Sequence, residues 1–226
     1  TEQICKQSTC FVTLKQGSFV LSCCLIITLY FLAIYMFVSS NRSVSDLKRD
    51  HALFSLSTPT SDNGFLIYWQ NENQEIRPHV RDARVEYGEW NYKPNMWHSI
   101  CTTWDSVTGL VQIWFDGKPS IRKNTISGAI TQTATLLLGQ VIFTQNLHGG
   151  GFDINESFVG MVSDVHMWDY ILSPCEVQNY MDKGSLTPGN VLNWKALDFW
   201  IIGNVLIENQ VFLCCKFFSC ENHFIG

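Results

Sequence analysis

The side chains that most often carry out catalysis are scattered along this chain and do not form a motif. None of the six histidines is spaced from a serine, cysteine or carboxylate as a base would be from its nucleophile. Acidic residues near aromatic ones are also too few to indicate a glycosidase. We therefore expect a binding protein and not an enzyme. The six histidines are His51, His79, His98, His148, His166 and His223.

The nine cysteines do not form a metal-binding pattern either. No C-x-x-C pair repeats and no two histidines lie at ligand spacing, so the sequence does not predict a zinc site. The long middle of the chain holds only Cys101 and Cys175, unlike the dense cysteine framework of a small disulfide-rich domain. Because the count is odd, at least one thiol stays unpaired within a single chain.

The chain is long and apolar enough to bury a sizeable core. Its 226 residues suffice for one large domain or two small ones, and 46% of them are apolar while only 15% are charged. The formal net charge of −5 gives no basic surface for phosphate backbones, so we expect no nucleic-acid partner. The same acidic excess is compatible with a protein that binds cations.

The stretch 17–40 carries no charged residue and is strongly apolar. It is long enough to cross a bilayer as a helix, with Lys15 and Arg42 at its ends. It is also compatible with a displaced signal sequence, cleaved before Asn41. A third interpretation is that it contributes strands to the core, because apolar β-rich runs imitate a membrane span. The sequence leaves all three open.

Most of the chain after residue 50 predicts β-strands. Residues 65–69 and 110–115 are short apolar runs rich in β-forming residues. Asp116-Gly117 follows the second run directly and is typical of a tight hairpin turn. Short strands separated by glycine and proline turns favour a β-sandwich. Further strands are expected at 120–123, 134–138 and 158–168.

One short helix is predicted, beginning near Pro174. Ser173 is the expected N-cap, and Glu176 completes a capping box in which each side chain accepts a hydrogen bond from an orphan backbone N–H. The helix should end at Lys183-Gly184. One face carries the apolar residues Val177, Tyr180 and Met181.

The segment 101–106 reads Cys-Thr-Thr-Trp-Asp-Ser. It is similar to the signature of the pentraxin family, a Cys–x–Ser/Thr–Trp–x–Ser/Thr segment. The family places a histidine two residues before this cysteine, where the chain has Ser99, with His98 one residue earlier. The chain resembles the short pentraxins because further segments match in the family's order. These segments are 114–119, 138–140, 159–160, 167–169, 172–174 and 190–197.

The resemblance implies an all-β, lectin-like jelly-roll sandwich of two antiparallel sheets with one short helix. It also implies a secreted pattern-recognition protein of innate immunity that assembles with copies of itself, as a homopentamer. Residues 46–213 are then the pentraxin domain, 1–45 a divergent N-terminal segment that includes the apolar run 17–40, and 214–226 a cysteine-rich tail of unknown role. Membrane anchoring through 17–40 stays open.

The resemblance further implies a pair of calcium ions, which join the protein to anionic ligands. Calcium prefers oxygen ligands, and its affinity depends on their charge. Thr144 and Asn146 fall on carboxylates of the family, and Glu156 falls on a glutamine. We therefore expect weaker binding than in a typical pentraxin, the alternative being a degenerate member with impaired calcium binding, anchored in a membrane through 17–40. The implied metal ligands are Asp62, Asn63, Thr144, Gln145, Asn146, Asp153 and Glu156.

The same resemblance places a ligand pocket beside the calcium site. Tyr68 aligns with an aromatic residue that packs against choline in the family. The family's glutamate for the choline cation falls near Ala83 or Arg84, and a positive residue there repels a quaternary ammonium group. We therefore expect an anionic phosphate or sugar ligand that contacts Tyr68, Arg81 and Arg84. The alternative is that these arginines lie on a solvated strand face and bind nothing specific.

The family joins its signature cysteine to a cysteine on an N-terminal strand. Here the resemblance implies that Cys101 pairs with Cys24 or Cys23. Cys24 keeps the expected face of that strand, since the faces alternate with a period of two residues.

Overall fold

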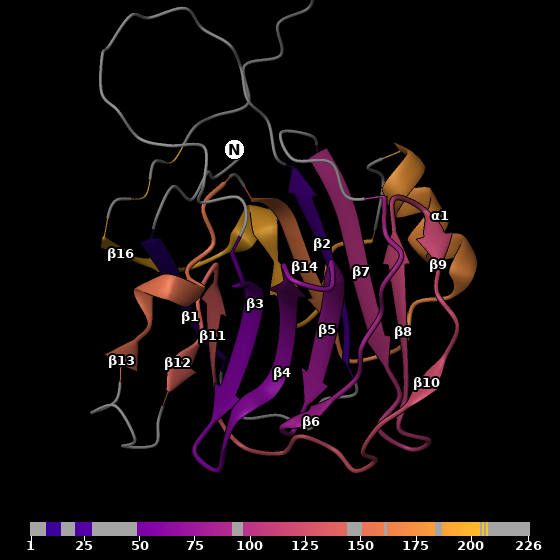
Figure 1. Ribbon diagram of the computed structural model, residues 1–226, viewed down its shortest axis with the longest axis horizontal. Coiled ribbons are helices and arrows are strands. Elements are labelled where there is room, and N and C mark those ends of the chain that lie inside the picture. Colours follow the sequence, from indigo (N-terminus) through magenta and orange to yellow (C-terminus); the bar gives the residue numbers. More distant parts are fainter. Residues whose placement is uncertain are drawn as a thin grey trace, which may run out of the picture.

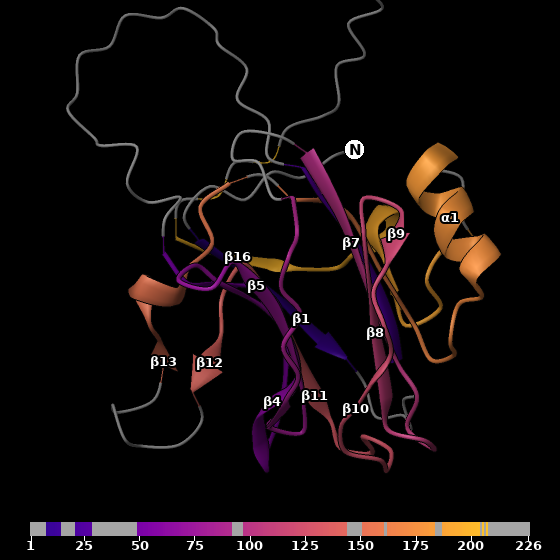
Figure 2. The same cartoon turned by 45° about the vertical axis from the view of Figure 1, so that its right-hand side comes forward.

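The computed structural model describes residues 8–14, 21–28, 49–91, 97–143, 151–160, 162–183, 187–203, 205 and 207. Two antiparallel sheets pack face to face as a jelly-roll β-sandwich (Figure 1). A short α-helix, α1 (Pro174–Lys183), lies against the outer side of the second sheet (Figure 2). The predicted all-β fold with one short helix is confirmed.

The first sheet contains seven strands in the order β16-β1-β11-β3-β4-β5-β6, and neighbouring strands are antiparallel. Its central hairpin, β3–β4, provides the face on which the candidate site lies. The strands are β16 (Trp200–Gly203), β1 (Ser8–Leu14), β11 (Ala134–Leu138), β3 (His51–Thr58), β4 (Ser61–Gln70), β5 (Glu75–Val80) and β6 (Ala83–Arg84).

The second sheet has the order β10-β8-β7-β2-β14-β15, with β9 paired to β8. A separate hairpin, β12–β13, lies outside both sheets (Figure 2). The strands are β10 (Lys123–Asn124), β8 (Leu110–Phe115), β7 (Trp97–Trp104), β2 (Leu21–Thr28), β14 (Ser163–Trp168), β15 (Leu192–Asn193), β9 (Lys118–Pro119), β12 (Ile142–Phe143) and β13 (Gly151–Phe152).

Alternate residues of each strand build the core between the sheets. In β4, Phe65, Ile67 and Trp69 are buried in this core, whereas Leu66 and Tyr68 lie on the opposite, outer face. This alternation follows from the two-residue period of a strand. Each apolar side chain removed from water contributes about 1.5–3 kcal/mol. The buried faces therefore fix which side chains of β4 are left for binding.

Part of the apolar run 17–40 forms strand β2, between β7 and β14 in the second sheet. The core-strand interpretation therefore holds for residues 21–28. The rest of the run, and the tail 214–226, lie outside the described residues. Among the residues that are described, no helix has both the length and the apolar character needed to cross a membrane.

Cys24 of β2 lies directly opposite Cys101 of β7, while Cys23 lies opposite Thr102. Cys101 is fully buried. The register therefore places Cys24, and not Cys23, across from the signature cysteine.

The helix α1 begins at Pro174, as predicted. The Ser173 N–H donates to Oε2 of Glu176 over 2.8 Å, and the Glu176 N–H donates to Oγ of Ser173 over 3.3 Å. The backbone N–H of Ser173, followed by its hydroxyl, holds the pKa of Glu176 below its ordinary value. Val177 and Tyr180 pack on Trp168 of the second sheet. The capping box and the apolar face of the helix are therefore both present.

Two strand boundaries differ from the prediction. The expected strand 120–123 is replaced by β9 and β10, because Ser120 interrupts the ladder: its Oγ accepts the Ile113 N–H over 3.0 Å. The expected strand 158–168 is shortened to β14, which begins at Ser163. The turn at Asp116-Gly117 has positive φ at both residues, 47° and 77°, as its sequence predicts.

Candidate functional site

The candidate site lies on the outer face of the first sheet. Leu66 and Tyr68 of β4 face outward there and pack with Ala52 and Val141. The hairpin β12–β13 and the short 3-10 helix η2 (Ile154–Glu156) lie over this face, on the side away from the second sheet (Figure 2). The sheet and this covering segment together form the site.

Tyr68 and Glu156 join the sheet to the covering segment. The hydroxyl of Tyr68 donates to Oε1 of Glu156 over 3.4 Å. The pKa of Glu156 is raised, first because the carboxyl group is partly buried and second because the Asp153 carboxylate is nearby. Burial, followed by the charge of Glu156, also raises the pKa of Tyr68. The site therefore holds two carboxylates that repel each other.

Asp153 is the N-cap of η2. Its Oδ1 accepts hydrogen bonds from the backbone N–H and from Nδ2 of Asn155, over 2.8 and 2.9 Å. Its Oδ2 accepts no hydrogen bond from a described residue. One oxygen of Asp153 thus orients the side chain, and the second is available for a ligand.

Arg49 and Gln140 hold the backbone of this segment. Arg49 donates to the carbonyl oxygens of Ile154 and Ser157 over 2.8 and 2.7 Å. Nε2 of Gln140 donates to the carbonyl oxygen of Asp153 over 3.0 Å and to Oγ of Ser157 over 2.6 Å. The Arg49 guanidinium therefore binds carbonyl groups and forms no ion pair with a described carboxylate.

Asp62 and Asn63 lie at the other end of β4. The backbone N–H and Nδ2 of Asn63 both donate to Oδ1 of Asp82 over 3.1 Å. Asp62 precedes Tyr68 by six positions, and a strand of that length spans about 20 Å. The two backbone positions, and with them the two groups of expected ligands, are therefore far apart.

The expected metal ligands are thus only partly brought together. Asp153 and Glu156 are neighbours, while Asp62 and Asn63 form a separate group. Thr144, Gln145 and Asn146 lie outside the described residues. Where the structure is described, no group of three or more histidine, cysteine, aspartate or glutamate side chains is placed to hold a metal ion.

The expected ligand pocket is also divided. The ring of His79 lies 6.4 Å from the ring of Tyr68, and Arg84 lies opposite His79 in the register of β5 and β6. Burial, followed by the charge of Arg84, lowers the pKa of His79 to about 4, so its ring is neutral. Arg81 instead lies in the turn before β6 and donates to the carbonyl oxygen of Ser127 over 3.1 Å.

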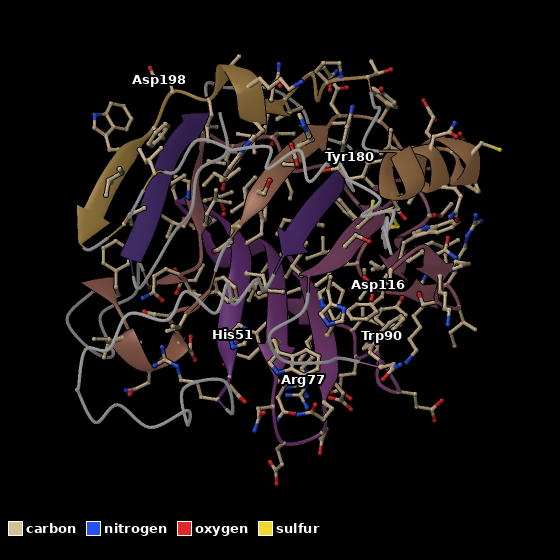
Figure 3. The ribbon with its side chains drawn as sticks, turned by 90° about the horizontal axis from the view of Figure 1, so that it is seen from above. His51, Arg77, Trp90, Asp116, Tyr180 and Asp198 are labelled. Carbon is tan, nitrogen blue, oxygen red and sulfur yellow. The ribbon has the colours of Figure 1, made fainter. Side chains whose placement is uncertain are left out.

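Carboxylates neutralise the other cations around Tyr68. Arg77, directly opposite Tyr68 in the register, contacts Glu75 over 2.7 Å. Arg84 contacts Glu86 over 2.8 Å, and its side chain is 52% exposed. Figure 3 shows Arg77 and His51 at the same end of the first sheet, far from Tyr180 of α1. Arg84 is therefore an exposed cation across from His79, on the strand next to β5.

Sequence reasoning did not find Arg49 or Gln140 as residues that hold the site. Arg49 contacts a residue 105 positions away, so no local pattern announces it. Gln140 belongs to a segment that resembles the family, which was its only signal in the sequence.

The sandwich with a loop segment over one sheet defines a lectin-like binding fold. The chain belongs to the pentraxin family, because the model described as "Pentaxin family" matches residues 32–209. It is 39% identical to C-reactive protein of Rattus norvegicus over 176 residues, which cover 76% of this chain and 74% of that protein. It is 34% identical to serum amyloid P-component of Rattus norvegicus over 171 residues, or 75% and 72% of the two chains.

A solved structure shares the fold. The native heptameric SAP-like pentraxin from Limulus polyphemus superimposes with a TM-score of 0.72 and 20% sequence identity. The match covers 91% of this chain and 94% of that one. The resemblance to the pentraxin family is thus confirmed both by sequence and by fold.

Proposed function

We propose that the chain is a secreted pattern-recognition pentraxin that binds anionic phosphate or sugar groups through calcium, and that it is not an enzyme. The observation that carries the proposal is the pair of carboxylates, Asp153 and Glu156, beside Tyr68. Burial, followed by the nearby charge of Asp153, raises the pKa of Glu156. A divalent cation is the natural partner for such a pair.

The two carboxylates fit calcium chemically. Calcium takes six to eight oxygen ligands, often from carboxylates, and tolerates irregular geometry. Among the described residues, Oδ2 of Asp153 accepts no hydrogen bond, and the Glu156 carboxylate accepts only a long one from Tyr68. By resemblance to the family, Asp62, Asn63, Thr144, Gln145 and Asn146 would supply further oxygens. When bound, the ion supplies positive charge that attracts the anionic oxygens of a ligand.

The residues of the chain orient such a ligand. Tyr68 presents a ring on the outer face of β4, against which the body of a ligand packs. Arg84 presents a guanidinium that an anion can reach in competition with Glu86. A positive group near Arg84 would be repelled, so the site favours phosphate or acidic sugar over a quaternary ammonium.

We also propose that the chain assembles with copies of itself, with five subunits expected from the family. The similar structure from Limulus polyphemus is described as heptameric, which supports self-assembly and leaves the number of subunits to be measured. Native mass spectrometry of the purified chain, in calcium and in chelator, gives the number of subunits directly. A monomer in both conditions would contradict assembly.

The function is tested by calcium-dependent capture. Agarose carrying phosphate monoester groups, and agarose carrying glucuronic acid, should each be compared with plain agarose. The chain should bind one of the charged resins in calcium and elute in chelator, and the variant Asp153→Asn should bind less. Equal retention on plain agarose, or retention that ignores chelator, would contradict the proposal.

A second candidate is a degenerate pentraxin that has lost calcium binding. The separation of Asp62 and Asn63 from Asp153 and Glu156 favours it. In that case the melting temperature of the chain should be the same in calcium and in chelator. The melting temperatures in calcium and in chelator therefore distinguish the two candidates.

A further inference from the structure

A small cavity lies at the end of β4 opposite to Tyr68. It has a volume of about 140 Å³ and opens between the β3–β4 hairpin, at the lower edge of Figure 1, and the segment 129–132 that precedes β11. Polar side chains dominate its lining. They are Thr58, Thr60, Ser61, Arg81, Thr131 and Gln132.

Arg81 has a backbone conformation that other residue types usually adopt. Arg81 and Asp82 form the two-residue turn between β5 and β6, with φ of 46° and 66°. Asparagine and glycine are the usual residues of such a turn, and other side chains cost about 1 kcal/mol or more at positive φ. The preference of the turn therefore does not explain an arginine here.

Hydrogen bonds to β4 hold this turn in place. The Arg81 N–H donates to the carbonyl oxygen of Gly64, and the Asp82 N–H donates to that of Asn63, each over 3.0 Å. The carboxylate of Asp82 in turn accepts both donors of Asn63. The turn thus presents Arg81 to the cavity in a fixed direction.

The guanidinium of Arg81 is charged and unneutralised. It forms no ion pair with a described carboxylate, whereas Arg77 and Arg84 pair with Glu75 and Glu86. Nη1 donates to the Ser127 carbonyl oxygen. Gly128, at φ of 103°, makes room for it, because a Cβ there would lie 2.8 Å from Nη1.

Two further donors line the cavity. Oγ of Ser61 is buried and has no hydrogen-bond partner among the described residues. Thr60 donates to Oε1 of Gln132 over 2.7 Å, which leaves Nε2 of Gln132 as a donor to the cavity. A buried hydroxyl without a partner costs about 1–3 kcal/mol, and a ligand that accepts its proton removes that cost.

We propose that this cavity binds a single tetrahedral oxyanion, a phosphate or sulfate group, without calcium. A guanidinium, an amide N–H and a hydroxyl all donate, and charge-assisted bonds to such an anion are strong. A water molecule takes up roughly 30 Å³ in the liquid, so a cavity of about 140 Å³ has room for such a group. Gly64, beside Arg81, precedes Tyr68 by four positions, about 13 Å of strand, so this site is separate from Glu156.

The test is a titration with inorganic sulfate in the presence of chelator, in which isothermal titration calorimetry measures the binding. The wild-type chain should bind one sulfate, and Arg81→Asn should weaken binding at least tenfold. Asparagine suits the left-handed backbone, so this variant should remain folded. Ser61→Ala should weaken binding by a smaller factor.

Lys118→Gln is the control, because it removes an exposed positive charge on β9, in the other sheet and outside both proposed sites. It should bind sulfate as the wild type does, and so should Asp153→Asn, which separates this proposal from the calcium site. The affinities for glucose 6-phosphate and glucose 6-sulfate are then compared. The tighter ligand shows whether the natural anion is a phosphate or a sulfate group. No sulfate binding by the wild type, or equal binding by wild type and Arg81→Asn, would overturn the proposal.

Discussion

The hydroxyl of Tyr68 lies 3.4 Å from Oε1 of Glu156, a residue 88 positions later in the chain. This contact fixes the covering segment over the outer face of β4. It also places a partly buried carboxylate beside Asp153, without an arginine or lysine of the described chain to neutralise either. The stability of the site should therefore depend on pH and on divalent cations.

The raised pKa of Glu156 predicts that the chain loses stability as pH rises in chelator. In the folded chain the group keeps its proton to a higher pH than in the unfolded chain. The stabilisation is fully present below the ordinary pKa of glutamate and is lost as pH rises through the folded pKa. Thermal melting between pH 4 and pH 7 measures this loss, and Glu156→Gln should reduce it.

Glutamine keeps the shape of the side chain and an oxygen for Tyr68, so the variant isolates the charge. Asp169→Asn, at an exposed position outside the site, serves as the control and should keep the wild-type pH dependence. A pH dependence that is unchanged in Glu156→Gln would show that the buried carboxyl is not its origin.

Cys24 and Cys101 should form a disulfide. They lie directly opposite each other on β2 and β7. A bridge that closes a loop of this length contributes about 4 kcal/mol by restricting the unfolded chain. Cys101→Ser should therefore lower the free energy of unfolding by about this amount, measured by chemical denaturation of oxidised protein.

Cys175→Ser is the control for that experiment, because Cys175 is an exposed free thiol. Its effect should stay within about 0.5 kcal/mol. Peptide mapping under non-reducing conditions identifies the pairing directly. A peptide that joins Cys101 to Cys23, or Cys101 recovered as a free thiol, would contradict the predicted bond.

The capping box of α1 should contribute measurably to stability. Ser173→Ala removes the hydroxyl that accepts the Glu176 N–H, and loss of such a cap costs about 1 kcal/mol. Ser173→Asp keeps an acceptor and should cost less. Equal unfolding free energies for the wild type and Ser173→Ala would mean that solvent replaces the cap without loss.

Local rules explain why much of the fold could be predicted. The capping box and the Asp116-Gly117 turn act over a few neighbouring residues, and both appear where their sequences place them. The run 17–40 was ambiguous because an apolar β-rich sequence and a membrane helix share the same pattern. The pairing of residues 21–28 with β7 and β14, which sequence alone does not reveal, assigns that part to β2.

The site was less predictable because it depends on distant contacts. Arg81 and Arg84 are only three positions apart in the sequence, yet the turn at Arg81-Asp82 directs their side chains toward different parts of the protein. Arg84 lies across from His79, and Arg81 reaches Ser127. Asp62 and Glu156 were grouped as ligands of one site, while about 20 Å of strand lies between Asp62 and Tyr68, the residue that contacts Glu156.

Calcium should stabilise the folded chain and protect its covering segment. Ligands that bind only the folded state raise stability by mass action, about 2.7 kcal/mol at a concentration 100 times Kd. The melting temperature should therefore be higher in millimolar calcium than in chelator, and cleavage between Val141 and Phe158 should slow. Asp153→Asn should weaken both effects while keeping Oδ1 as the acceptor for Asn155.

Asp164→Asn is the matched control for Asp153→Asn. Asp164 lies in β14, outside the covering segment, and has φ of 50°, which asparagine also tolerates. The substitution Asp164→Asn removes one carboxylate outside the site, so the response of this variant to calcium should be the same as that of the wild type. If melting and proteolysis are identical in calcium and in chelator for all three proteins, the carboxylate pair binds no calcium. The chain would then be a pentraxin in which Asp153 and Glu156 remain without a cation.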